Sequence, residues 1–580
     1  LLLPVQEKEE NAAVAVLDGN NEVVKRFNVR LAVDKVDYYV PLDISKLSTL
    51  NSQLLLDITF HGDRRATGAI KDFACWREMR YADEFDTTNR ERFRPVYHHT
   101  PLYGWMNDPN GMFYMPSSPS GNDGQAVYMP SSPSGNDGQA VYIPSSPSGN
   151  DGQAGSSDGV WHLYYQYNPY GSQWENMTWG HSTSRDLVHW EAQPTAIEPD
   201  GLGAIFSGSC VVVNHSTTDV DGDVSQGDVV AMYTSAGAAQ VQSVAVSKDG
   251  GMTFRKFGGN PVLTAEAPDF RDPKMFWNED AKMWNVILAV GQEMQIFSSK
   301  DLKEWKYESS FGKEYGSHGG VWECPDLFPL TLTAKQPNDP STKWVLLCNI
   351  NPGGPFGGSA TQYFVGDFDG HKFTCESMPK VTKWLDYGKD HYATVSFYNA
   401  PDNRRVVLAW MSNWQYANQV PTRQFRSSNS IPRDLGLLTH GEETYVSVVP
   451  SEEMLALRGQ KVKKPTEACE MVIDLKGSAD IVLSNAKGEQ VVMRYDAQQQ
   501  TFSMDRTQSG DTSFSENFAC TTTAPTYGQL KQLRIFIDRC SIEAFDADGR
   551  MAMTNLVFPS EPYNSVKVKG GKATIYEMSK

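Results

Sequence analysis

The octapeptide SRDLVHWE, Ser184 to Glu191, contains the pattern that decides the fold: an acidic turn followed by an aromatic residue at the start of a strand. The same plan returns at SKDGGMTFRK (247–256), SKDLKEWKY (299–307) and GDFDGHKFT (366–374). The aromatic residues of the four copies are Trp190, Phe254, Trp305 and Phe373. They recur about every 50–70 residues, which is the spacing of propeller blades. The stretch from about Val96 to Leu435 holds roughly five such units and predicts a five-bladed β-propeller.

Most other segments also look like short strands between turns rich in Gly, Asn and Asp. Examples are VVLAWM (406–411), LRIFID (533–538) and SIEAFD (541–546), and convincing amphipathic helices are scarce. The predicted fold class is therefore all-β. Residues 94–435 are assigned to the propeller, residues 436–580 to a C-terminal β-sandwich and residues 1–93 to a small N-terminal β-sandwich-like domain.

One segment, residues 114–154, departs from the strand pattern. It contains YMPSSPSGNDGQAV and two near-copies, starting at Tyr114, Tyr128 and Tyr142. Pro, Ser, Gly, Asn and Asp dominate each copy, so the segment can form turns but cannot bury a core. We predict a surface loop or an expanded hairpin within the first blade, with a recognition arm over the site as the alternative.

Composition excludes several classes of function. The 580 residues include 52 Lys and Arg against 70 Asp and Glu, a formal net charge of −18, so binding to a phosphate backbone is not expected. No apolar run is long enough to span a bilayer. The eight cysteines stand singly and the eleven histidines show no metal-ligand spacing, so neither metal nor cofactor is predicted, while cysteine pairing stays open.

Acidic motifs open four of the five predicted units. They are NDPNG (107–111), FRDPKMFW (270–277), WECPDLF (322–328) and KDHYATVSF (389–397). Each carboxylate precedes an apolar run that forms a strand, and the first strand of each blade lines the axial cavity of a propeller. The carboxylates predicted to converge on one axial pocket are Asp108, Asp272, Glu323 and Asp390.

Two of these carboxylates fit the two roles that cleave a glycosidic bond. Like charges in one pocket cannot all ionise freely, so one pKa should rise while another stays low. Asn107 and Asn110 can hydrogen-bond Asp108 and keep it ionised, as a nucleophile requires. Glu323 lies between a tryptophan and a cysteine, an apolar setting that favours the protonated form of a general acid.

Other residues of the motifs would hold the sugar. Arg271 would keep Asp272 charged, so that this carboxylate accepts hydrogen bonds from paired sugar hydroxyls. Trp105, Trp174 and Phe206 would form an apolar wall against a sugar ring, or else would pack between blades.

The motifs also resemble those of a known family. Six motifs resemble those of glycoside hydrolase family 32 in order and spacing: WMNDPNG (105–111), YYQYNP (164–169), WGHSTSRDLVHW (179–190), FSGS (206–209), RDP (271–273) and ECPDLF (323–328). Three more resemble its fructan-cleaving branch of levanases and exo-inulinases: GGSATQYFVGDFDG (357–370), DYGKDHYA (386–393) and MSNWQYANQVPT (411–422). The likeness spans about residues 97–435 and continues weakly into the C-terminal domain.

The resemblance implies a glycosidase whose propeller is the catalytic domain. It would cleave terminal β-D-fructofuranosyl bonds of levan, inulin or sucrose with retention, through a covalent fructosyl-enzyme. By motif match Asp108 is the nucleophile, Glu323 the acid/base and Asp272 the transition-state stabiliser. The residues placed around the fructose are Asn107, Gln166, Trp174, Phe206, Ser207, Arg271 and Asp390. The implied partner is a fructan oligosaccharide or polysaccharide, and the implied location is secreted, periplasmic or cell-surface, with the signal absent from this chain, which begins LLLPVQEKEE.

Two other interpretations stay open. An inverting, arabinanase-like glycosidase on a similar propeller would hold its carboxyl groups about 6.5–9.5 Å apart instead of about 5–5.5 Å. A non-catalytic fructan-binding protein would keep the pocket without the chemistry, although the presence of both Asp108 and Glu323 disfavours it. The choice among levan, inulin and sucrose, exo or endo attack and the oligomeric state also stay open.

Overall fold

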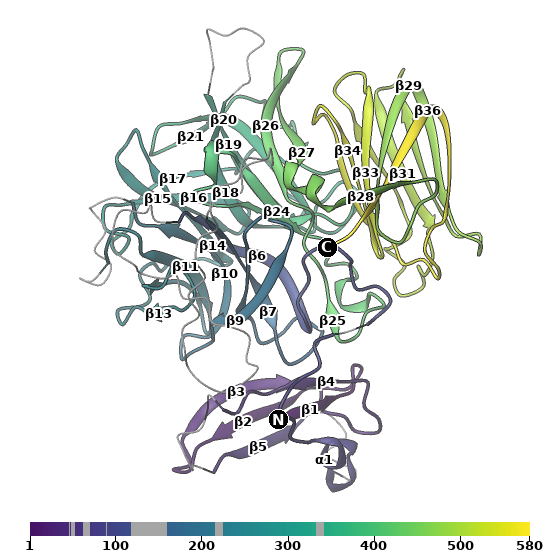
Figure 1. Ribbon diagram of the computed structural model, residues 1–580. Helices are drawn as coiled ribbons and strands as arrows, with labels where there is room; N and C mark the ends of the chain where they lie inside the picture. The colour runs from purple at the N-terminus through teal and green to yellow at the C-terminus, as the bar shows by residue number, and fades with distance from the viewer. Residues whose placement is uncertain are drawn as a thin grey trace, which may run out of the picture.

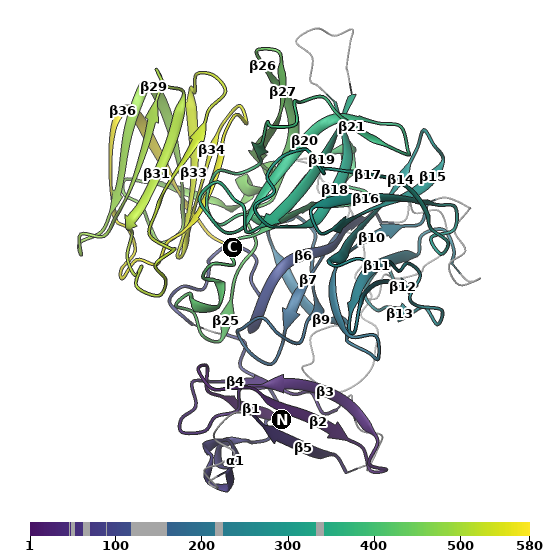
Figure 2. The same ribbon diagram turned by 180° about the vertical axis from the view of Figure 1, so that it is seen from behind.

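The computed structural model describes residues 1–45, 47, 53–61, 70–88, 90–117, 159–214, 224–331 and 342–580. Regular structure in these ranges is almost all β-strand and forms three bodies (Figures 1 and 2). A small N-terminal domain lies below a central propeller, and a C-terminal sandwich lies beside it. The predicted all-β class is confirmed. The predicted repeat loop lies, from residue 118 onward, outside the described residues.

Five antiparallel sheets form the propeller, one for each predicted unit. The first contains β6 (Gly104–Met115), β7 (Val160–Asn168), β8 (Thr178–Ser184) and β9 (Trp190–Ile197). The second contains β10 (Ala204–Val212), β11 (Val229–Ala236), β12 (Gln240–Ser247) and β13 (Arg255–Lys256). The third contains β14 (Phe270–Asn278), β15 (Met283–Val290), β16 (Glu293–Ser299) and β17 (Lys306–Phe311).

The last two sheets carry small additions. The fourth contains β18 (Val321–Thr331), β19 (Thr342–Asn351), β20 (Ala360–Phe368) and β21 (Phe373–Cys375), with β22 (Lys383–Trp384) on β20. The fifth contains β23 (Tyr392–Ser396), β24 (Val406–Trp410), β26 (Arg433–His440) and β27 (Glu443–Pro450). The two-residue strand β25 (Phe425–Arg426) joins β6 in parallel. The predicted propeller boundary at residue 435 falls inside β26, because the sheet continues to Pro450.

The acidic repeat forms the turn into the outermost strand of the first four blades. In each copy one aspartate oxygen accepts backbone N–H groups two to four residues ahead, a local bond that Asp makes readily. These aspartates are Asp186, Asp249, Asp301 and Asp369. The aromatic residue that follows lies at or just before the start of β9, β13, β17 or β21. The repeat recurs because these four blades share the same turn and an aromatic residue at the same place.

The innermost strands β6, β10, β14, β18 and β23 contact one another in order around a ring, which closes from β23 to β6. Each has a β-bulge at the same place, where two residues of the inner strand lie opposite one residue of its neighbour. These two are called here the first and second bulge residues. In blades three to five the first bulge residue has a left-handed φ: Asp272 65°, Cys324 42° and Ala393 55°. A bulge breaks the alternation of side chains and re-aims them, so the ring offers five equivalent places for functional groups.

The C-terminal sandwich is built around two long strands. Its strands are β28 (Arg458–Val462), β29 (Cys469–Ser484), β30 (Gln490–Asp496), β31 (Thr501–Gln508), β32 (Thr521–Pro525), β33 (Gln532–Asp538), β34 (Ser541–Asp546), β35 (Ala552–Leu556) and β36 (Ser565–Met578). The first part of β29 pairs with β33 and its second part with β30, while β36 pairs along both parts. The two layers therefore share the β29–β36 pair.

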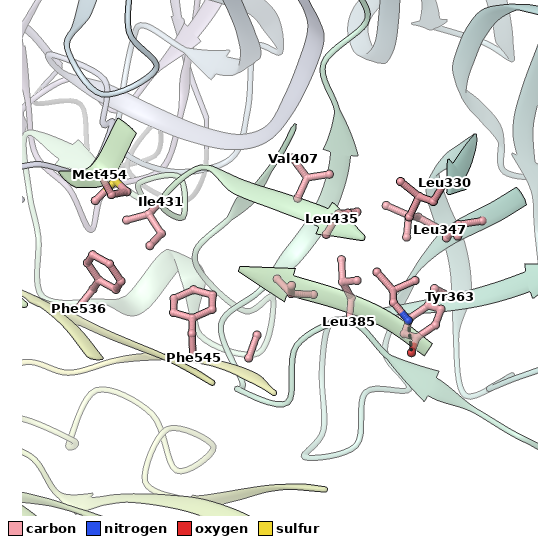
Figure 3. Close-up of a cluster of buried hydrophobic side chains, with 14 of the residues drawn as sticks. Leu330, Leu347, Tyr363, Leu385, Val407, Ile431, Leu435, Met454, Phe536 and Phe545 are labelled. Atoms are coloured by element: carbon pink, nitrogen blue, oxygen red, sulfur yellow. Dashed lines mark hydrogen bonds between the residues drawn. The ribbon is translucent and has the colours of Figure 1, made fainter. Parts of the chain in front are cut away.

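A continuous apolar cluster joins the propeller to the sandwich (Figure 3). Leu347 of the fourth blade and Val407 and Leu435 of the fifth belong to the same buried cluster as Phe536 and Phe545 of the sandwich. Burial of large aromatic side chains stabilises such an interface by about 1.5–3 kcal/mol each. The sandwich is therefore fixed to the propeller.

The N-terminal domain has two small sheets. β1 (Leu2–Val5) pairs with β4 (Tyr38–Pro41), and β2 (Ala12–Leu17) lies between β3 (Val23–Val29) and β5 (Leu55–Phe60). They are followed by η2 (Ile70–Asp72) and α1 (Ala74–Glu78). Elsewhere in the described ranges, the 3-10 helices are η3 (Pro401–Asn403), η4 (Ala417–Gln419) and η5 (Glu452–Leu457). Among the described residues, none of the helices has the length and apolar character needed to span a bilayer.

Candidate active site

Three carboxylates come from three successive positions of the bulge, each in a different blade. Glu323 precedes the bulge of β18, Asp272 is the first bulge residue of β14, and Asp108 is the second bulge residue of β6. Cys324 ties the group together: its Sγ lies 3.3 Å from Asp108 Oδ2 and 3.6 Å from Asp272 Oδ2. The backbone N–H of Cys324 also donates to Asp272 Oδ2 at 2.9 Å. The structure thus brings Asp108, Asp272 and Glu323 into one site.

Asp108 is held by three donors. Ser207 Oγ donates to Oδ2 at 2.7 Å, Asn107 Nδ2 donates to Oδ1 at 3.1 Å, and Cys324 Sγ contacts Oδ2. Burial raises the pKa of Asp108, while these three hydrogen bonds act to lower it. Asn110, the second expected partner, instead accepts the Gly208 N–H at 3.3 Å. The contacts fix the orientation of the carboxylate and favour its ionised form.

Glu323 is held by a cation and a phenol. Arg271 donates to Oε1 from Nε at 3.2 Å and from Nη2 at 3.0 Å, and the Tyr392 hydroxyl donates to Oε2. Burial raises the pKa of Glu323; Arg271 lowers it and the nearby charge of Asp108 raises it again. The predicted rise is present, although its setting is a network of polar contacts as well as apolar neighbours.

The pKa of Asp272 is also raised. Burial raises its pKa from 3.8 to about 7; Arg271 opposes the shift, while Glu323 and Asp108 add to it. Arg271 acts on the pKa of Asp272 in the expected direction, but its charge does not offset the effect of burial. Arg271 Nε lies 3.9 Å from Asp272 Oδ2, whereas its closer carboxylate partners are Glu323 and Asp269, the latter at 2.6 Å.

Replacing Asp272 with Asn should stabilise the fold at neutral pH. A folded-state pKa above the unfolded one means that the stability linked to Asp272 is present below about pH 4 and is lost as the pH rises through about 7. Urea unfolding at pH 8 should therefore show Asp272→Asn to be more stable than wild type by about 2 kcal/mol, and the two should agree near pH 3.5.

The turn residue Asp301 provides a control of opposite sign. Backbone N–H groups of Glu304 and Lys303 lower its pKa against a raising effect of burial, so Asp301→Asn should lose stability at pH 8. An Asp272→Asn protein that is less stable than wild type at pH 8 would contradict the prediction that the ionised Asp272 carboxylate destabilises the fold.

Five further predicted residues lie around the cluster. Ser207 and Asn107 contact Asp108 directly. Gln166 in β7 is buried and donates to the carbonyl of Ile205 at 2.9 Å. Phe206 is the first bulge residue of β10, and its ring centroid lies 6.0 Å from that of Trp174. Trp174 itself is 42% exposed, so its ring is accessible to a ligand.

Two predicted residues do not belong to this group. Asp390 is completely buried, and Tyr416 and Arg506 donate to its two carboxylate oxygens, as does the backbone N–H of Leu556. Because Arg506 and Leu556 belong to the sandwich, Asp390 joins two domains and has no carboxylate oxygen left for a sugar. Trp105 is likewise fully buried, against Trp414 and Trp410, and is a packing residue.

The site also contains two residues whose contacts the sequence did not predict. Cys324 contacts two of the carboxylates, and Tyr392 donates to the third. Each lies in a quoted motif and at the bulge, and because the bulge is seen only when the strands are paired, the sequence alone does not single out either residue. Within the described ranges, no group of three or more His, Cys, Asp or Glu is placed to hold a metal ion. All eight cysteines are described, and all are free.

Three family profiles match the chain. Residues 150–448 match the N-terminal domain of the glycosyl hydrolases family 32, and residues 443–579 match the C-terminal domain of that family. Residues 1–97 match a domain of unknown function (DUF4980). The first match begins after β6, so the position of Asp108 rests on the motif and on the geometry above.

Named relatives agree with these matches. The levanase of Bacillus subtilis (strain 168) is 40% identical over 499 residues, which are 81% of this chain and 67% of the levanase. The crystal structure of the exo-inulinase from Aspergillus awamori superposes with a TM-score of 0.70 at 30% identity, covering 85% of this chain and 99% of that one. The β-fructofuranosidase from Schwanniomyces occidentalis complexed with fructosyl-erythritol gives 0.69 at 30% identity, covering 86% and 100%.

Proposed function

The chain belongs to glycoside hydrolase family 32, and from this membership we propose that it hydrolyses terminal β-D-fructofuranosyl bonds of fructans, and also of sucrose, with retention of configuration. The observation that carries the proposal is the joint placement of Asp108, Asp272 and Glu323 on the bulges of three inner strands. Hydrolysis of such a bond needs one carboxylate as nucleophile and one carboxylic acid as proton donor.

In the first step Asp108 attacks the anomeric carbon of the terminal fructose. The bond to the leaving oxygen breaks, and Glu323 gives its proton to that oxygen, so a fructosyl ester of Asp108 forms. Ser207 and Asn107 hold the attacking carboxylate in place. Asp272 accepts hydrogen bonds from fructose hydroxyls, and these bonds strengthen as positive charge develops on the ring.

In the second step water attacks the anomeric carbon and releases Asp108. Glu323, now deprotonated, takes a proton from this water. In the free protein the charge of Asp108 raises the pKa of Glu323. The ester removes that charge, so the pKa of Glu323 falls and its deprotonated form, the base of this step, is favoured. Arg271 and Tyr392 then stabilise the Glu323 carboxylate.

Retention separates this mechanism from that of an inverting propeller glycosidase. Hydrolysis of inulin followed by proton NMR within the first minutes should show release of the β-anomer of fructose before mutarotation. First release of the α-anomer would indicate inversion and exclude a fructosyl ester. Absence of any turnover on inulin, levan and sucrose would instead favour a protein that only binds fructans.

Names of relatives support the substrate and the location. One is called a levanase, several are called exo-inulinases and another is called an invertase, so levan, inulin and sucrose are the substrates to assay. Several of the inulinases are called extracellular, which supports a secreted, periplasmic or cell-surface location for this protein.

A further inference from the structure

The N-terminal domain is attached to the propeller mainly through the loop that carries Trp174. This loop, residues 169–177, connects β7 to β8 and is called here the Trp174 loop. On the basis of the proposed function, we propose that the N-terminal domain is a positioning domain, which holds this loop so that Trp174 stands in place against the bound fructan.

The first attachment is an inserted ring. Tyr170 of the loop lies in the buried core cluster of the N-terminal domain and stacks on Phe27, with ring centroids 3.9 Å apart. The loop therefore completes the core of the other domain. An aromatic side chain buried in this way is costly to withdraw, by about 1.5–3 kcal/mol from its apolar area alone.

The second attachment centres on Glu7 of the N-terminal domain. Ser172 Oγ donates to Glu7 Oε2 at 2.8 Å, and Gln173 Nε2 donates to the Glu7 carbonyl at 3.1 Å. Tyr38 donates to the same carboxylate at 2.8 Å and accepts from the Ser172 N–H at 3.1 Å. Arg426 closes the group, since its Nη1 lies 2.9 Å from Glu7 Oε1 and 2.8 Å from the Ser172 carbonyl.

The third attachment follows Trp174 directly in the chain. Glu175 accepts hydrogen bonds from Asn28 Nδ2 at 2.6 Å and from Asn11, and Arg30 lies 3.6 Å from it. The Asn176 side chain pairs with the backbone of Asn28 in both directions, each bond being 2.8 Å long. Hydrogen bonds to a charged group of this kind contribute more than neutral ones.

Trp174 is the member of the loop whose ring contacts Phe206, next to the site. Its neighbours Gln173 and Glu175 are bonded to the N-terminal domain, while its own ring is 42% exposed and faces Phe206. Phe206 precedes Ser207, which donates to Asp108. A chain of contacts therefore runs from the N-terminal domain to the mouth of the site without passing through a catalytic carboxylate.

The test compares two identical substitutions on the propeller side of the domain interface. Glu175→Gln removes the charge of Glu175 and replaces one of the two oxygens that accept from Asn28 and Asn11 with a donor, whereas Glu198→Gln breaks another ion pair between the same domains, with Lys25 at 2.7 Å, from outside the Trp174 loop. Glu175→Gln should raise KM on inulin about tenfold with kcat nearly unchanged, because the lost contact binds substrate and transition state alike. Glu198→Gln should leave both constants unchanged.

Three further experiments separate positioning from a general structural effect. Hydrogen exchange followed by mass spectrometry should show faster exchange of residues 169–177 in Glu175→Gln and wild-type exchange in Glu198→Gln. Asn28→Asp, which places a second carboxylate against Glu175, should repeat both effects of Glu175→Gln. In a Trp174→Ala background, Glu175→Gln should have no further effect on KM.

Three outcomes would overturn the proposal. One is an unchanged KM in both Glu175→Gln and Asn28→Asp while Trp174→Ala raises it. Another is a rise of KM in Glu198→Gln equal to the rise in Glu175→Gln. The third is unchanged exchange of the loop in Glu175→Gln, a result that needs no activity. Failure of the proposed function would appear separately, as absence of turnover in the wild type.

Discussion

Replacing Asp108 with asparagine is expected to lower kcat on inulin by at least about 10⁴-fold with no loss of stability. The amide cannot form the ester with the anomeric carbon, so the first step is lost. Asparagine keeps the shape of the side chain. It also replaces a buried carboxylate whose pKa is raised by burial with a neutral group, which should increase the free energy of unfolding at neutral pH. Initial rates on inulin and a urea unfolding curve for the same sample measure both parts.

The same substitution at Asp249 is the matched control. Asp249 makes the turn of the acidic repeat in the second blade and accepts two backbone N–H groups there. Asp249→Asn should keep activity within about twofold and lose about 1 kcal/mol of stability. If Asp108→Asn instead behaves like Asp249→Asn, with activity retained at more than a few per cent, Asp108 is a turn residue and the mechanism is wrong.

Replacing Glu323 with glutamine is expected to lower kcat/KM on inulin by about 10³-fold but to spare a fructoside with a good leaving group, such as an aryl fructoside. The sugar alcohol leaves only when protonated, whereas a phenolate leaves unaided. Because Glu323 is also the base of the second step, the aryl fructoside should give a burst of phenol followed by slow turnover. Stopped-flow absorbance measures the burst.

Added azide provides the control for this substitution. Azide attacks the fructosyl ester without needing a base, so it should restore the steady-state rate of Glu323→Gln on the aryl substrate and leave wild type unaffected. An equal loss on inulin and on the aryl fructoside, with no burst, would remove Glu323 from the role of proton donor.

The fold could be predicted because its repeating unit is local. The turn at Asp186 forms from neighbouring residues, so its copies at Asp249, Asp301 and Asp369 are visible in the sequence. The end of the propeller could not be placed this way. The fifth sheet pairs β24 with β26 across a long connection, and pairing between distant segments leaves no local signal.

Of the site, the sequence predicted the three carboxylates but fewer of their partners. Asp390 was wrongly placed, since nothing in KDHYATVSF reveals that Arg506, in another domain, covers it. Arg271 does lie 3.9 Å from Asp272, but its shorter contact with Glu323 was not predicted, because it crosses from one blade to the next. Contacts across blades depend on the bulges, and a bulge is visible only once both strands are paired.

The five bulges also make the inner ring modular. The position before the bulge is occupied in blade order by Met106, Ile205, Arg271, Glu323 and Tyr392, and the first bulge position by Asn107, Phe206, Asp272, Cys324 and Ala393. The register with the second strand is the same in all five blades whichever side chain stands at these positions, and blades three to five also share a left-handed φ at the first bulge position. Side chains can therefore be exchanged one blade at a time while the scaffold stays the same, and a ring of this kind can acquire a new specificity through single substitutions.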